Sequence, residues 1–496
     1  MMKRTAAAVM TILTLTALIS CGESPAPAQI SPAQAADAAE NVTQPETETE
    51  PEFIDSLPDD LDFGRTEINI ACYDQSHAVE FSVEQTGEVV DDARYGRNVK
   101  TEERMNVKLN PISLNVGWGD YLGALRKVLR AGDDSYDALY LWQYDFCPLA
   151  VEGLFLDLTG APYIDLSQPW WAKDYMANVA VDDSKTYFLF GDFTPSLINS
   201  MTALYYNRKL YGDMSGDPDR LYADVLDGKW TFDAMSSAIK GWYSDLNGDG
   251  AKDIGDRYGM CLYKGGGSAS EYFMINMGCE FSYRDGEGLP VIDPIGGGRG
   301  EKITDCLDRI IALRSTDDVS AEMVDNDQDL NVFSNGNVGF IANVIGKAHI
   351  LRDMEDDYGV LPYPKYDELQ SGYITAVWDA AMMAALPSNC QKKEAVCAAF
   401  ESLAALGYRD VIPVYYEIAL KTKYARDEMS SKMIDLLHGS LHADFAYINN
   451  YGLKNVVTIV RDMQAAGENT YVSWWAKNES KIQKALEKMI NAQKEL

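Results

Sequence analysis

The sequence predicts an α/β protein whose body folds into two lobes, each built around an open, largely parallel β-sheet. Segments of strand character alternate with segments of helical character along the chain, which is the order of a parallel sheet with crossover helices. The body, from about Gly64 to Leu496, is too long for one simple domain, so two lobes are expected. Apolar residues make up 46% of the chain, which is enough to build a large core.

The first part of the body contains three strand-like segments separated by helix-like ones. The predicted elements are a strand at 67–73, a helix at 91–106, a strand at 107–111, a helix at 118–130 and a strand at 137–142. In the second helix apolar residues recur at helical spacing, which predicts one buried face. Because ligands of open α/β sheets bind at the carboxyl ends of the strands, the candidate binding loops are those after Tyr73 and Leu141.

A second series of elements follows. The predicted elements are a strand at 203–207, a helix capped by Thr231, a helix at 301–314, a strand at 338–343 and an apolar run at 380–386. From Lys392 onward the chain is expected to be chiefly helical. No internal repeat is visible, so the two lobes are not read as copies of one unit.

The N-terminus has the organisation of an export signal. The basic segment Met-Met-Lys-Arg precedes an apolar stretch at 6–19 that is too short to span a bilayer. The stretch ends in Leu-Ile-Ser-Cys, which resembles the lipobox of bacterial lipoproteins. The resemblance implies a signal peptide at 1–20, a lipid on Cys21 and a protein anchored at the extracytoplasmic face of the cell membrane. The alternative is an ordinary cleaved signal followed by a chance cysteine.

Residues 21–63 predict a disordered acidic linker, because they are rich in Pro, Ala and carboxylates and poor in groups that could form a core. The formal net charge of −33 argues against nucleic acid as a partner, since phosphate binding needs clustered Lys and Arg. No second apolar run approaches membrane-spanning length, so the body is expected outside the bilayer. The cysteines beyond Cys21 are scattered and form no disulfide framework.

Several stretches, in their order and spacing, match a known pattern. They lie at 137–142, 153–158, 164–171, 204–210, 228–233, 333–342 and 359–365. Together they resemble the extracellular solute-binding protein family 1, the sugar-binding lipoproteins of ABC importers. The resemblance implies a periplasmic-binding-protein-like type II fold, with two α/β lobes joined by a hinge and a ligand cleft between them. The expected lobes are 64–198 with 328–370, and 199–327 with 371–496.

The same resemblance implies a function and partners. The protein is expected to be a monomer that captures an extracellular carbohydrate, in particular an oligosaccharide, and delivers it to an ABC permease in the membrane. Peptides and other polar solutes stay open as ligands. No GxSxG or phosphate-binding loop is present, and no pair of carboxylates stands out for glycoside hydrolysis, so no enzyme activity is expected. The rival functions are a secreted glycoside hydrolase and a carbohydrate-binding surface scaffold.

Sugars are held by aromatic platforms and planar polar groups, because pyranose rings have apolar faces and hydroxyl edges. Side chains of both kinds occur on the loops after the strands and at the expected crossings between the lobes. The candidate ligand-binding residues are Asp74, Gln75, Trp142, Tyr144, Asp192, Trp378 and Asp379. The alternative for each tryptophan is a partly buried core position.

An acidic loop at 245–256 has the spacing of a calcium-binding loop. Oxygen ligands fall at positions 1, 3, 5, 9 and 12, Gly250 occupies position 6, and a backbone carbonyl is available at position 7. The candidate calcium ligands are Asp245, Asn247, Asp249, Ala251, Asp253 and Asp256. A strand rather than a helix follows, which favours a single structural calcium ion. The alternative is a pair of glycine turns in a solvated acidic surface.

Overall fold

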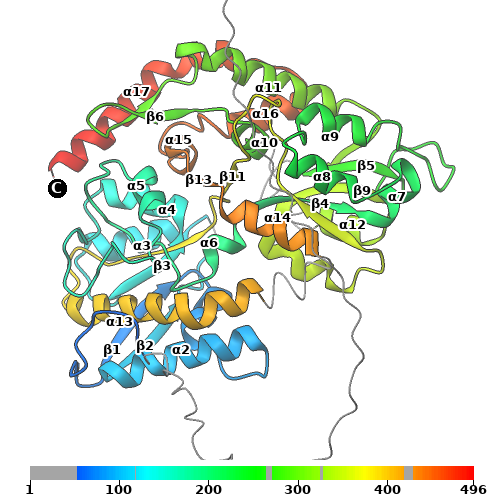
Figure 1. Ribbon diagram of the computed structural model, residues 1–496. Helices are drawn as coiled ribbons and strands as arrows, with labels where there is room; N and C mark the ends of the chain where they lie inside the picture. The colour runs from blue at the N-terminus through cyan, green and yellow to red at the C-terminus, as the bar shows by residue number, and fades with distance from the viewer. Residues whose placement is uncertain (1–52, 118, 264–270, 324–327, 418–427, 496) are drawn as a thin grey trace, which may run out of the picture. The chain divides into compact units, whose positions relative to one another are not determined.

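The computed structural model describes residues 53–117, 119–263, 271–323, 328–417 and 428–495. The signal peptide, Cys21 and most of the acidic linker lie outside these residues. Figure 1 shows the described part as two regions of sheet and helix, with further helices of the C-terminal part of the chain beside both.

The first sheet has four strands in the order β12-β3-β1-β2. They are β1 (Thr66–Cys72), β2 (Val107–Ser113), β3 (Ala138–Trp142) and β12 (Met382–Ala385). β1 pairs in parallel with β2 and β3, whereas β12 runs antiparallel to β3. The helices of this lobe are α1 (Gln75–Ser82), α2 (Val89–Met105), α3 (Tyr121–Arg130), α4 (Gln143–Val151), α5 (Lys173–Val179) and α13 (Lys393–Leu406). The interior strand β3 is buried on both faces, as its apolar sequence predicts.

The second sheet has five strands in the order β10-β4-β9-β5-β8. They are β4 (Thr202–Asn207), β5 (Tyr258–Tyr263), β8 (Val319–Met323), β9 (Val338–Val344) and β10 (Tyr358–Leu361). Its helices are α7 (Arg208–Ser215), α8 (Arg220–Leu226), α9 (Phe232–Ala238), α10 (Glu271–Asn276), α11 (Arg299–Arg314), α12 (Gln328–Ser334) and α14 (Glu428–His438). Thr231 caps α9 by accepting a hydrogen bond from the amide of Ala234, as predicted.

The first sheet is largely parallel, as predicted, with β12 as its one antiparallel strand, whereas the second sheet is evenly mixed. In the second sheet β4 runs antiparallel to β9 and β10, while β5 pairs in parallel with β8 and β9. The antiparallel strands β4 and β12 are those that follow a passage of the chain from one lobe to the other. Because the chain enters each of these strands from the other lobe, no crossover helix within the same lobe fixes the strand direction.

The strand pairing corrects the predicted division into lobes. β9 and β10 belong to the sheet of β4, although 328–370 was assigned to the first lobe. β12 belongs to the first sheet, although everything after 370 was assigned to the second. The chain therefore stays in the second lobe until it passes Val377, which bridges Met201, and returns directly into β12.

The predicted linker also ends too late. The amide of Leu57 bonds to the Asp55 side chain, and Leu57 is buried in the hydrophobic core. The Asp55 carboxylate accepts a hydrogen bond of 2.7 Å from Arg104 on α2, and the Arg104 guanidinium lies over the ring of Phe53. The folded body thus starts at Phe53 instead of 64. This acidic segment is ordered because Leu57 packs into the core and Asp55 binds the buried Arg104.

The remaining elements connect the two lobes. They are α6 (Ser196–Asn199), β6 (Ser282–Arg284), β7 (Pro290–Ile292), β11 (Thr375–Ala376), β13 (Leu441–His442), α15 (Phe445–Ile448), α16 (Ile459–Ala466) and α17 (Tyr471–Glu495). α17 packs against α4 of the first lobe and against α11 and β7 on the side of the second. Within the described residues, no helix has the length and apolarity needed to cross a membrane.

Candidate ligand-binding site

A row of aromatic side chains begins where two strands of the first sheet end. Trp142 is the last residue of β3, and its ring centroid lies 4.5 Å from that of Tyr73, directly after β1. Tyr144, in the first turn of α4, stacks on Trp142 at 5.8 Å with an angle of 20° between the ring planes. Tyr144 in turn lies 5.5 Å from Tyr451, in the segment after α15. The row therefore joins the first sheet to the C-terminal part of the chain.

Asp74 and Gln75 lie beside this row. Asp74 caps α1 by accepting from the amide of His77, and its carboxylate is 2.6 Å from the His77 ring nitrogen. Partial burial opposes ionisation, but hydrogen bonds from Ser76 and His77 outweigh it and lower the pKa of Asp74. The His77 ring meets Trp142 edge-on at 5.5 Å. Gln75 accepts a hydrogen bond from Ser113 at the end of β2, so both predicted residues hold the strand ends in place.

Two buried carboxylates accompany the aromatic row. Asp145 follows Tyr144 and is 3% exposed, and its carboxylate accepts a hydrogen bond from the Tyr121 hydroxyl. Asp379, between β11 and β12, is 7% exposed, and its backbone amide donates to the Tyr447 hydroxyl over 3.2 Å. Burial raises the pKa of Asp145 to about 7 and that of Asp379 to about 6. The negative charge of Asp379 also raises the pKa of Asp145, so the two carboxylates lie close enough to repel each other.

The opposite side of Asp379 is formed by a tyrosine pair and an ion pair. Tyr447 and Tyr272 share a hydrogen bond of 2.6 Å between their hydroxyls. Glu271, fully buried at the start of α10, is bound by the Arg461 guanidinium of α16, whose Nε lies 2.9 Å from each carboxylate oxygen. α10 and α16 thus place hydroxyl and charged groups next to a carboxylate from the crossing segment.

The other predicted residues have different places. Trp378 lies in the same crossing, where its carbonyl accepts from Gln143 and its amide donates to Ser200, while its ring is half-buried against the core. Asp192 contacts other groups: its amide donates to Trp170, and its carbonyl leaves room only for a glycine at 407. Burial raises the pKa of Asp192 to about 7. The structure therefore brings together the loops around 74, 142 and 379, but Asp192 has no contact with the aromatic row.

The residues of this site that were not predicted include Tyr272, Glu271 and Arg461, together with five side chains of the first lobe and the C-terminal segment. Tyr73 and Asp145 lie within three positions of predicted site residues, so the rule of strand ends could have found them. Tyr121, Tyr447 and Tyr451 had no signal of their own, because tyrosine is abundant in this chain and residues after 392 were read only as helical.

The acidic loop has the turns expected from its sequence. Gly248 and Gly250 both have a φ of +75°, and their amides donate to the two oxygens of Asp245 over 2.6 and 2.9 Å. Asp256 is fully buried and accepts from the amide of Leu246 and from the hydroxyl of Tyr243. In the described residues no three acidic, histidine or cysteine side chains converge as a metal site. The carboxylates accept hydrogen bonds from amides of their own loop, and calcium binding at 245–256 stays a prediction.

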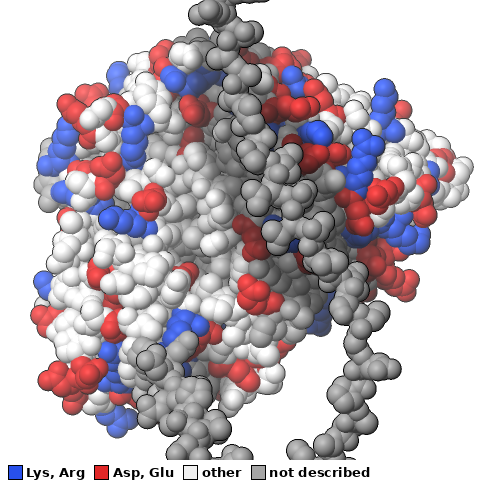
Figure 2. All heavy atoms as spheres, viewed as in Figure 1, with Lys and Arg blue, Asp and Glu red and all other residues white. Residues whose placement is uncertain are grey.

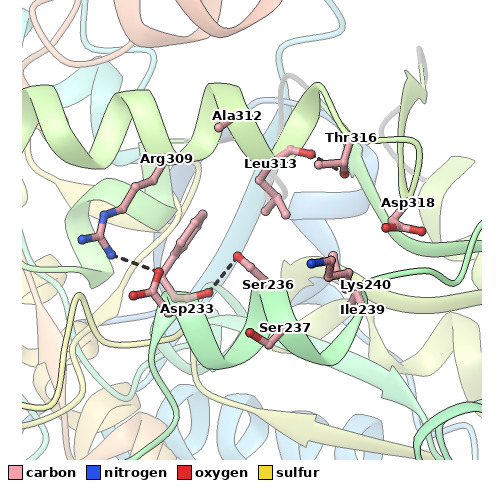
Figure 3. Close-up of a pocket in the computed structure, with 11 residues that line it drawn as sticks. Asp233, Ser236, Ser237, Ile239, Lys240, Arg309, Ala312, Leu313, Thr316 and Asp318 are labelled. Carbon is pink, nitrogen blue, oxygen red and sulfur yellow. Dashed lines mark hydrogen bonds and ion pairs between the residues drawn. The ribbon is translucent and has the colours of Figure 1, made fainter.

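A separate hollow lies between α9 and α11, with a volume of about 530 Å³. Figure 3 shows Asp233 and Arg309 at one end of it, joined by an ion pair of 3.2 Å, and Asp318 at the other. None of the predicted ligand-binding residues lines it. Figure 2 shows acidic and basic side chains interspersed over the visible face, with uncharged surface between them.

Comparison with known proteins finds no matching family model and no matching curated protein. Among solved structures, the chain is similar to UgpB from Mycobacterium tuberculosis in complex with glycerophosphocholine, with a TM-score of 0.55 and 14% identity over 87% of this chain and 99% of that one. It is also similar to a sugar transporter from Rhizobium etli in an open conformation, with a TM-score of 0.54 and 15% identity over 87% and 100% of the two chains. A third similar structure is the maltose/maltodextrin-binding domain MalE from Bdellovibrio bacteriovorus bound to maltotriose, with a TM-score of 0.52 and 14% identity over 87% and 99%.

These structures share one class of architecture, the two-lobe α/β fold of maltose-binding-protein-like solute-binding proteins. This chain has that fold, and the predicted type II class is confirmed. At identities of 14 to 15% the likeness concerns the fold alone.

Proposed function

We propose that this protein is the substrate-binding component of an ABC importer and captures an extracellular carbohydrate, in particular an oligosaccharide. The observation that carries the proposal is the aromatic row at the strand ends, flanked by the carboxylates of Asp145 and Asp379. Aromatic faces bind the apolar faces of sugar rings, and the carboxylates accept hydrogen bonds from hydroxyl edges. The fold supports the proposal, because similar structures are bound to maltotriose and to glycerophosphocholine.

The row also fits the rule that ligands of α/β sheets lie at the carboxyl ends of the strands. Trp142, Tyr73 and the crossing residue Asp379 all stand at such ends or beside them. Binding there would let a solute contact the first lobe, the crossing segment and the C-terminal helices at once. That is the arrangement that a receptor needs if solute binding is to change the relation between its lobes.

The test is a titration of the purified body, residues 53–496, with neutral oligosaccharides, followed by tryptophan fluorescence and by thermal shift. We expect saturable binding and a rise in melting temperature. Trp142→Ala and Tyr451→Ala should weaken binding about tenfold or more, because each removes an aromatic face. Tyr408→Ala is the matched control, since Tyr408 is 43% exposed and Tyr451 50% exposed, but Tyr408 contacts Trp170 instead of the row.

The solute should be recovered intact after long incubation. Shortened products would instead favour a secreted glycoside hydrolase, and binding without any permease partner would favour a surface scaffold. Loss of affinity in Tyr408→Ala equal to that in Tyr451→Ala would contradict the placement of the site.

We further propose that the mature chain begins at Cys21 and is lipid-anchored at the extracytoplasmic face, where a permease would lie within reach of the body. The support is the lipobox-like sequence alone, since residues 1–52 lie outside the described structure. Cys21→Ser should move the protein from the membrane fraction to the medium, and mass spectrometry of the native N-terminus should detect a diacylglyceryl group.

A further inference from the structure

We infer that the solute recognised by this site carries a positive charge, so that the ligand is an amine- or ammonium-bearing carbohydrate rather than a neutral or acidic one. This inference rests on the proposed function and narrows its substrate class. Two buried acids lie beside the aromatic row, and a site for a neutral sugar does not require them.

The aromatic row presents the π-faces that cations prefer. Tyr73, Trp142, Tyr144 and Tyr451 follow one another with ring centroids 4.5 to 5.8 Å apart. Each ring carries negative potential on its face, and Trp and Tyr are the strongest aromatic partners of an ammonium group. No Lys or Arg of the described residues lies over the rings of Tyr73, Trp142 or Tyr451.

The two carboxylates beside the row have no cation of their own. The Asp145 carboxylate accepts a hydrogen bond from the hydroxyl of Tyr121, and Asp379 is hydrogen-bonded to Tyr447. Neither carboxylate forms an ion pair with a described residue, although both side chains are more than nine-tenths buried. A buried carboxylate without a counter-charge is costly to ionise, so a bound cation would stabilise the ionised form of both acids.

The nearest cations are already paired. Arg126 of α3, whose charge acts on Asp145, is bound to Glu152 with its Nε 3.0 Å from the carboxylate. Arg461, whose charge acts on Asp379, is bound to Glu271. His77 is paired with Asp74 at 2.6 Å. Arg461 thus faces its own acid, Arg126 shares Glu152 with Arg130, and none of these guanidinium groups forms an ion pair with Asp145 or Asp379.

The same balance disfavours acidic sugars. A uronate or sulfate at the row would meet the two carboxylates, and like charges in a partly dry site repel strongly. A neutral sugar could use the carboxylates only as hydrogen-bond acceptors. An ammonium group satisfies the aromatic faces and the carboxylates together, and it lowers the free energy of the ionised acids.

A consequence is that binding should release protons. Because burial holds the pKa of Asp145 near 7 and that of Asp379 near 6, both acids are partly protonated in neutral solution without ligand. A bound cation favours their ionised forms, so it lowers both pKa values and drives protons into the buffer. For a ligand with a fixed charge, affinity should rise as pH increases from about 5 to about 8.

The experiment compares sugars that differ by an ammonium group in place of a hydroxyl. Pairs of glucosamine with glucose, galactosamine with galactose, and glucosamine oligomers with cello-oligomers are titrated into residues 53–496 by calorimetry, with N-acetylated and uronic analogues alongside. We expect the amine to bind about tenfold or more tightly than its neutral partner. N-acetylation, which removes the charge, should abolish the difference. Proton release should be seen as a dependence of the heat on the ionisation enthalpy of the buffer.

Asp145→Asn and Asp379→Asn keep the size and polarity of each side chain while removing its charge. Each should reduce the preference for the amine and the proton release, and a thermal unfolding transition like that of the wild type would show that the variant is folded. Asp174→Asn on α5 is the matched control, since Asp174 is an exposed acid of the same lobe.

The outcomes separate the two proposals. Neutral sugars that bind as tightly as their amines would overturn this inference and leave the carbohydrate receptor standing. Binding of acidic sugars in preference to both would overturn it as well. Failure of every sugar in the set would contradict the proposed function itself, and with it the inference.

Discussion

At the scale of single residues, Glu401 has an unusual place in the first lobe. It lies fully buried on α13, and its carboxylate accepts 3.0 Å hydrogen bonds from the indole nitrogens of Trp170 and Trp171. The amide of Asp165 donates to it as well. Trp170 and Trp171 follow each other directly in the chain. The pair is buried, and the one acid that satisfies both indoles is more than 200 positions away, which no local pattern reveals.

Glu401 should make stability depend on pH. Burial raises the pKa of Glu401 to about 7, above its value in the unfolded chain. An acid with a raised pKa stabilises the fold fully at low pH, and this stabilisation is lost as pH rises through the folded-state pKa. We expect the free energy of unfolding to fall by about 2 kcal/mol between pH 5 and pH 8 through this group. Glu401→Gln should flatten that part of the profile.

The measurement is urea unfolding at a series of pH values for the wild type and the variant. Glu394→Gln is the control, because Glu394 is exposed in the first turn of the same helix. A variant profile parallel to that of the wild type would show that Glu401 stays ionised at both ends of the range.

At the scale of elements, the sequence predicted the strands better than their partners. The segments near β1, β2, β3, β4 and β9 were all found, because each is a short apolar or alternating run beside a helical pattern. The calcium loop is a similar case. Its turns were predicted correctly from glycine positions, whereas occupancy by a metal ion depends on how carboxylates orient and is not fixed by spacing.

Calcium binding at 245–256 remains a prediction that a direct measurement can decide. If the loop binds calcium, Asp245 and Asp249 must turn from loop amides toward the ion, with Asp256 completing the shell. We then expect millimolar calcium to raise the melting temperature by several degrees through ligand linkage. Asp249→Asn should reduce the shift, and Asp213→Asn, an exposed acid on α7, should leave it unchanged. Equal melting temperatures with calcium and with chelator would show that the turns close the loop without metal.

At the scale of the whole molecule, the two-lobe fold could be predicted but the path between lobes could not. Lobe count follows from length and from the order of elements, which are visible in the sequence. Assignment of β9, β10 and β12 depends on which strands pair across 130 residues or more, and an apolar strand such as Val338–Val344 fits either sheet equally well. Trp142 and Asp379 could be predicted as site residues from their local position in the chain. The tyrosines of α10 and α15 beside Asp379 come from distant segments, so they were missed.

The two lobes are held by more than the crossing segments. One continuous hydrophobic cluster contains Ile70 and Leu139 of the first sheet as well as Met260 and Phe340 of the second. In addition, Arg284 of the β6–β7 hairpin donates hydrogen bonds of 2.5, 3.0 and 2.6 Å to three carbonyls at the end of α5. A cation at a helix C-terminus that also satisfies free carbonyls is a strong tie between elements distant in sequence.

We therefore expect the body to unfold as one cooperative unit in calorimetry, even though a chain of this size could unfold lobe by lobe. Arg284→Gln should lower the melting temperature by a few degrees, because it leaves the partly buried carbonyls of Ala177 and Ala180 without this donor, at a cost of about 1–3 kcal/mol. Arg220→Gln, a change of the same kind at a side chain that is 75% exposed, should have little effect. Since the shared core persists in the variant, its transition should shift without dividing.

Two resolved transitions in the wild type would mean that the common hydrophobic cluster holds the lobes together less strongly than each lobe's own core holds that lobe. Two transitions that appear only in Arg284→Gln would mean that the Arg284 guanidinium is the main contact between the lobes.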